Sequence, residues 1–68
     1  MHVIVVRLRA AELSARMGEM RQWLDRSRIQ AGSFRYEMTG ANATVRVGFN
    51  TAVEAEAFRT AFDGVSGQ

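Results

Sequence analysis

The chain contains no cysteine, no proline and no lysine, and it has a single histidine. Without cysteine it can form no disulfide, no thiolate metal site and no cysteine nucleophile. Its longest apolar run, residues 3–6, is far shorter than the roughly 20 residues that cross a bilayer. No basic residue precedes this run, as one would in a signal peptide. We therefore expect a cytoplasmic protein without a membrane partner.

Length and charge narrow the range of functions further. The 68 residues, of which 47% are hydrophobic, suit one small α/β domain. We expect this domain to span residues 1–65, with residues 66–68 as a frayed C-terminal tail. All nine basic residues are arginine, and with seven acidic residues the net charge is +2. So small a net charge attracts polyanions only weakly.

The first half of the chain predicts a strand followed by a helix. Residues 2–9 are rich in valine and isoleucine and carry apolar side chains on both faces, which is typical of a buried strand. Residues 11–28 repeat apolar side chains at helical spacing, and this stripe consists of Leu13, Met17, Met20 and Leu24.

The second half predicts a hairpin and a second helix. Residues 33–39 and 43–49 alternate between apolar and polar side chains, and Gly40, Ala41 and Asn42 between them favour a tight turn. The loop can have two residues or four. Residues 52–63 predict a helix, because residues 51–54 match a capping box and Gly64 supplies a left-handed stop.

The element order βαββα predicts a two-layer α+β sandwich with two helices on one face of a three-stranded sheet. By analogy with ferredoxin-like folds, the strand order is 1-3-2 and antiparallel, without the last strand of that fold. A 1-2-3 order with a parallel first pair is the alternative. The expected core consists of Ile4, Val6, Leu8, Leu13, Met17, Met20, Leu24, Phe34, Tyr36, Val45, Val47, Phe49, Phe58 and Phe62.

The missing last strand would leave an edge of strand 1 exposed. An apolar edge without proline or a central charge is an aggregation hazard, and small domains often gain stability by associating. We therefore predict a homodimer through strand 1, with Val3, Val5 and Arg7 at the interface. Either the strand edge or the helix-free face of the sheet makes the contact, and a stable monomer is the alternative.

Three arginines are the candidate binding site. Both loop lengths give the same register, in which Arg35 lies directly opposite Arg46 on the helix-free face. Arg7 of strand 1 points to the same face. Like charges in opposite positions destabilise a strand pair, so these side chains could bind an anionic partner. The alternative is a solvated surface on which Glu37 bridges the arginines. Nucleic-acid binding through these arginines should be weak, because the aromatic side chains fall on the opposite face.

The remaining polar residues do not form a recognisable catalytic or metal-binding motif. His2 has no second ligand or orienting group near it in the sequence, whereas a metal site needs three or four ligands. No glycine-rich phosphate loop or paired-carboxylate motif occurs, so we expect a non-enzymatic protein without a cofactor.

Four stretches carry a resemblance to known sequences. Residues 17–25, together with residues 34–37, 45–49 and 54–58, are similar to short uncharacterised bacterial proteins of about 65–70 residues. This resemblance covers nearly the whole chain and implies a bacterial origin. That group has no established activity, so the resemblance implies no functional residues.

Overall fold

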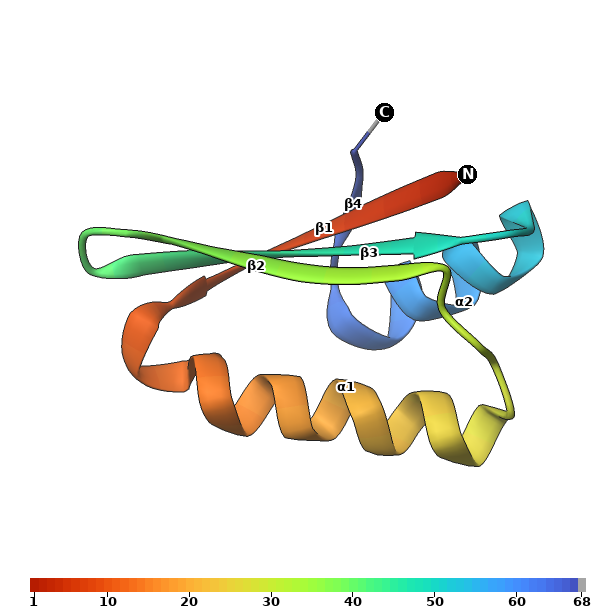
Figure 1. Cartoon of the computed structure of the whole chain (residues 1–68), viewed down its shortest axis with the longest axis horizontal. Coiled ribbons are helices and arrows are strands. Elements are labelled where there is room, and N and C mark those ends of the chain that lie inside the picture. Colours follow the sequence, from red (N-terminus) through yellow and green to blue (C-terminus); the bar gives the residue numbers. More distant parts are fainter. Residues whose placement is uncertain (68) are drawn as a thin grey trace.

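A four-stranded antiparallel sheet forms one layer of the computed structural model, which describes residues 1–67, and two helices form the other layer (Figure 1). Along the chain the elements are β1 (His2–Arg9), the 3-10 turn η1 (Ala10–Glu12), α1 (Leu13–Ser27), β2 (Ser33–Thr39), β3 (Asn42–Phe49), α2 (Ala52–Phe62) and β4 (Val65–Ser66). Both helices lie on the same face of the sheet, so its other face is open.

The strand order β2-β3-β1-β4 confirms the predicted 1-3-2 arrangement and its antiparallel pairing. The 1-2-3 alternative with a parallel first pair is wrong. The prediction of three strands is also wrong, because β4 adds a fourth strand beside β1. The fold thus resembles the complete ferredoxin-like arrangement, with a last strand of two residues.

Gly64 allows the chain to reach the edge of β1. A Cβ atom on this residue would lie 2.7 Å from Ile4 Cγ2 and 3.1 Å from the backbone oxygen of Val5. The left-handed residue that ends α2 is Asp63, with φ 54°, and not Gly64 as the sequence predicts. The glycine is therefore needed for close approach to β1 and not for a positive φ.

The predicted domain end at residue 65 also needs correction. Ser66 pairs with Ile4 in β4, and the backbone N–H of Gly67 donates to the carbonyl oxygen of Val3 at 2.8 Å. Two of the three residues expected to fray are therefore held against β1. Gln68 lies outside the described residues.

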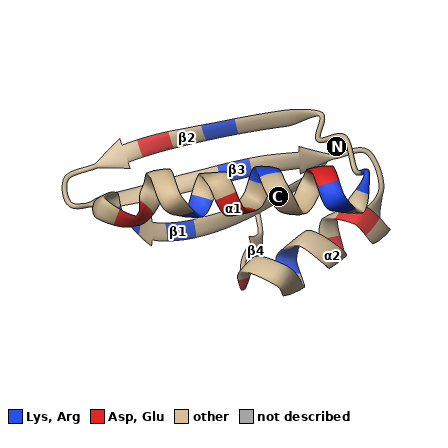
Figure 2. Cartoon of the chain, turned by 90° about the horizontal axis from the view of Figure 1, so that it is seen from below, with Lys and Arg blue, Asp and Glu red and all other residues tan. Residues whose placement is uncertain are grey.

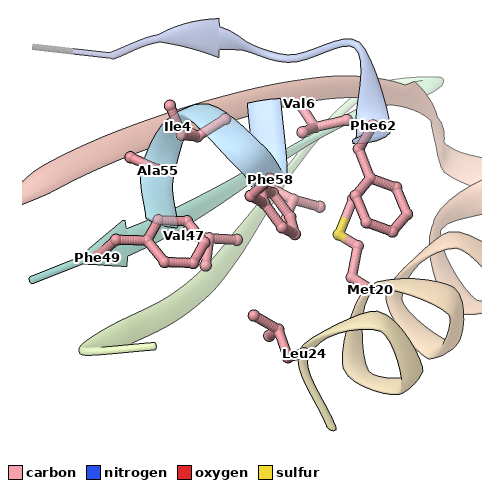
Figure 3. Packing of buried hydrophobic residues seen from close by; sticks show 10 residues of the cluster. Ile4, Val6, Met20, Leu24, Val47, Phe49, Ala55, Phe58 and Phe62 are labelled. Carbon is pink, nitrogen blue, oxygen red and sulfur yellow. The ribbon is translucent and has the colours of Figure 1, made fainter. Parts of the chain in front are cut away.

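The core lies between the sheet and the helices, with Phe58 at its centre (Figure 3). The largest fully buried side chains are Phe49, Phe58, Met20, Val45 and Val47. Half-buried Trp23 of α1 meets the ring of Phe58 edge-on at 5.5 Å and that of Phe62 at 6.1 Å. These aromatic contacts join the two helices, and each such pair adds about 0.5–1.5 kcal/mol beyond area burial.

Tyr36 is predicted in the core but is 57% exposed, and Met38 on the same side of β2 is 50% exposed. Both residues lie on the helix face of the sheet, since their partners Val45 and Ala43 in β3 are buried there. Viewed from the helix side, α1 lies across β3 and β1, and β2 runs clear of it (Figure 2). The inner face of this edge strand is therefore only partly covered.

Candidate partner-binding surface

The open face of the sheet brings the three predicted arginines together. Arg35 pairs directly with Arg46 across β2 and β3. Arg46 pairs with Val5 of β1, so Arg7 is the diagonal neighbour of Arg46. Figure 2 shows basic positions on all three of these neighbouring strands. The predicted opposition of like charges is thus confirmed.

Glu37 is the acidic residue among these arginines. Nη1 of Arg46 donates to Oε1 of Glu37 at 3.3 Å, and the two side chains remain 51% and 66% exposed. Exposed pairs of this kind contribute about 0–1 kcal/mol. Arg7 and Arg35 form no ion pair with any of residues 1–67. The surface thus offers two guanidinium groups that are free to bind an anion.

A shallow hollow lies beside Arg7, next to the part of β1 with which β4 does not pair. Its volume is about 530 Å³, and Arg7, Arg9, Glu12, Asn42 and Thr44 supply its polar lining. Leu8 and Ala43 complete the wall. The guanidinium, amide and hydroxyl groups are donors, and Glu12 adds a carboxylate to the same lining.

The residues predicted for a dimer interface on β1 are less available than expected. Val5 is only 9% exposed, because it lies between Arg46 and Val65 and because the tail passes over it. A Cβ on Gly67 would clash with Val5 Cγ2 and would lie 3.4 Å from Val3 Cγ1. The edge of β1 is therefore closed at Ile4 and Val5 by the same chain. The prediction that the edge of strand 1 is exposed, on which the dimer at this edge is based, is therefore wrong at Ile4 and Val5.

A groove between α1 and β2 is a feature that the sequence reasoning missed. It measures about 430 Å³ and is lined by Leu13, Ser14, Met17, Gly18, Arg21 and Tyr36. Arg21 also covers the ring of Phe34, with its Cζ atom 5.4 Å from the ring centroid. The predicted strand order could have revealed this groove, because it makes β2 an edge strand with an apolar inner face.

The other polar side chains in the described part of the chain either have a structural role or do not gather into a metal-binding group. Residues 1–67 contain no group of three His, Asp or Glu side chains that could hold a metal ion. The hydroxyl of Thr51 accepts the N–H of Glu54 at 3.2 Å, which confirms the predicted cap of α2. Among the same residues, no helix combines the length and apolar character that crossing a bilayer requires.

The exposed pair Glu56–Arg59 on α2 shifts the ionisation of both its members. Hydrogen bonds from Arg59 lower the pKa of Glu56, and the same carboxylate raises the pKa of Arg59. Nε of Arg59 lies 3.0 and 3.1 Å from the two carboxylate oxygens. These shifts follow from the pairing of two solvent-exposed side chains and lie away from the open face.

No family model, curated protein or solved structure matches this chain. The resemblance to short bacterial proteins therefore stays a prediction, and any function has to be argued from the surface itself.

Proposed function

We propose that this protein is a cytoplasmic, non-enzymatic interaction module that forms a homodimer and binds an anionic partner through Arg7, Arg35 and Arg46. The partner that suits this surface best is a protein segment rich in Asp and Glu. Three guanidinium groups on adjacent strands can donate hydrogen bonds to several carboxylates at once, and the planar fork of arginine suits each of them.

The uncompensated charge on the open face is the observation that supports this proposal. Arg7, Arg35 and Arg46 lie there with the carboxylate of Glu37, which is already bonded to Arg46. Arg35 faces Arg46 without an ion pair of its own among residues 1–67. An incoming carboxylate would neutralise part of the repulsion between Arg35 and Arg46. Binding would therefore be favoured by the loss of that repulsion.

Nucleic acid is the alternative anionic partner, and the sheet suits it less. Modules that bind single-stranded RNA on a sheet stack bases on exposed aromatic side chains. Here Phe34, Tyr36 and Phe49 alternate onto the helix face, opposite Arg35 and Arg46. Binding to phosphates would then rest on charge alone and would fall steeply with salt.

The test is a fluorescence anisotropy titration of a labelled decaglutamate peptide at about 20 and about 150 mM salt, where screening differs strongly. We expect saturable binding at low salt, weakened about fivefold or more in an Arg7→Gln, Arg35→Gln double variant. Arg26→Gln, on the exposed side of α1, is the control with the same type of charge change.

Two results would count against the proposal. One is a flat titration at low salt, and the other is an equal loss of affinity in the Arg26→Gln control. A parallel titration with a thymidine pentadecamer distinguishes the partner class. If the oligonucleotide binds more tightly than the peptide, the nucleic-acid alternative replaces the acidic protein segment.

A further inference from the structure

The outer edge of β2 is the longest unpaired strand edge in the described part of the chain. β2 pairs with β3 over all seven residues from Ser33 to Thr39, and no strand lies on its other side. An edge of this length exposes a row of backbone N–H and C=O groups. Unlike the edge of β1, it is not covered by a segment of the same chain.

The hairpin geometry fixes which residues present those groups. Thr39 and Asn42 face each other across the two-residue loop Gly40–Ala41, and Gly40 has φ +60°, as a tight hairpin turn requires. Such a loop makes Thr39 and Asn42 a hydrogen-bonded pair, and alternate residues then point away from the partner strand. The backbone groups of Phe34, Tyr36 and Met38 are thus directed at the free edge.

From this edge we propose that a second copy of the chain adds its own β2, antiparallel, with a two-fold axis through Tyr36. The proposal deepens the homodimer suggested above and rests on that part of the proposed function. Tyr36 is the midpoint of Ser33–Thr39, so this register pairs all seven residues of both strands. It joins the two sheets into one sheet of eight strands.

This register is charge-complementary on the open face. It places Arg35 of each copy opposite Glu37 of the other, in a non-hydrogen-bonded pair, where side chains approach most closely. Arg35 has no ion pair within its own chain among residues 1–67 and lies opposite Arg46. The second copy supplies a carboxylate for Arg35, and Glu37 remains next to Arg46. Each subunit of the dimer still carries Arg7, Arg35 and Arg46 for one Glu37, so the joined face keeps its positive charge and can bind an acidic segment as well. An axis through Arg35 or Glu37 would instead oppose identical charges, which is unfavourable.

The same register covers the exposed apolar side chains on the helix face. Tyr36 meets Tyr36 of the second copy, and Phe34 meets Met38. Tyr36 and Met38 are the large hydrophobic side chains that are left half exposed on this edge strand. Each subunit contributes its groove between α1 and β2, so Leu13 and Met17 face the joined cavity from both sides. Burial of apolar area is the main favourable term in such an association.

Charge exchange tests the register without requiring any core residue to change. The variants Arg35→Glu and Glu37→Arg each oppose like charges twice across the axis. We expect each to weaken self-association at least about tenfold in sedimentation equilibrium. Mixed in equal amounts, the two variants should form a heterodimer, because acidic positions 35 and 37 of one then face basic positions of the other. The double exchange Arg35→Glu, Glu37→Arg should restore the homodimer.

Matched controls carry the same charge changes on exposed positions of α1: Arg26→Glu and Asp25→Arg. They should leave the dimer unchanged within about twofold. Circular dichroism establishes that each variant is folded before association is measured. The proposed register is overturned if the dimer dissociation constant is unchanged in both single variants, or if an equal mixture of the two variants stays monomeric.

The outcomes also separate this inference from the proposed function. A wild-type protein that is monomeric up to about 0.5 mM, a concentration at which even weak pairing would be visible, rejects the homodimer altogether. Binding of the acidic peptide is measured separately and can persist in that case. A dimer insensitive to residues 35 and 37 rejects only its placement at β2.

Discussion

The two outer long strands of the sheet, β1 and β2, differ in whether another segment of the chain covers their free edge. At β1 the chain turns back after α2, and Gly64 lets β4 lie against Ile4 and Val5. At β2 no strand of residues 1–67 pairs with the outer edge. The inner face of β2 carries Tyr36 and Met38, which are half exposed. The edge with the most apolar strand is thus the protected one, and the less apolar strand is left open. Exposure is decided by which strand the rest of the chain can reach, and not by hydrophobicity alone.

The largest effect should come from truncating Phe58, which packs under β1 and β3, and the matched truncation is that of Tyr36 in the edge strand β2. Phe58 is fully buried under β1 and β3, so Phe58→Ala should lower the free energy of unfolding by about 3–5 kcal/mol. Tyr36→Ala at the open edge should cost less than about 1 kcal/mol. Urea denaturation at concentrations where the chain is monomeric measures both. Equal losses would mean that the β2 side is packed as tightly as the β1 side.

Gly64→Ala tests whether the closed edge depends on close approach. The added methyl group meets Ile4 Cγ2 and the backbone of Val5, so we expect a loss of about 1–3 kcal/mol. Gly18→Ala is the control: no atom lies within 4 Å of its added Cβ, and in mid-helix it should stabilise by about 0.5–1 kcal/mol. Hydrogen exchange of the Gly67 amide, which bonds to Val3, reports the release of β4 directly. Unchanged protection of that amide in Gly64→Ala would contradict this role.

The smallest effect concerns the exposed pair Glu56–Arg59 on α2, away from both edges. The pKa of Glu56 is lowered in the folded protein, so the pair stabilises the fold above the ordinary glutamate value of 4.5. That contribution is lost as the pH falls through the lowered pKa. The thermal midpoints of wild type and Glu56→Gln should therefore differ slightly at neutral pH and converge in acid. A difference that grows on acidification would reverse the assigned sign.

Much of this architecture could be read from residue patterns. The alternation in residues 33–39 and 43–49 predicts the hairpin register, and with it the facing pair Arg35 and Arg46. The apolar stripe of residues 13–24 predicts which side of α1 is buried, and its members Met20 and Leu24 are buried. These features depend on periods of two and 3.6 residues, which are local properties of the chain.

Features that depend on distant parts of the chain could not be read in this way. β4 has two residues, too few to show any alternation, and its pairing depends on space next to β1. The period of β2 indicates correctly that Tyr36 points to the helix side, but it does not tell where α1 lies across the sheet. Asp63 adopts the left-handed conformation predicted for Gly64, and the glycine lies one residue later, where it contacts β1.

The contacts of Trp23 have a practical consequence for spectroscopy. The chain has one tryptophan and one tyrosine, and the structure places them in different environments. Trp23 lies between the helices against Phe58 and Phe62, so its emission follows the docking of α1 on α2. Tyr36 stands at the open edge, and its ring reports on what happens there. The natural sequence thus carries two intrinsic optical probes, one for folding and one for assembly, that can be followed in the same sample without a label.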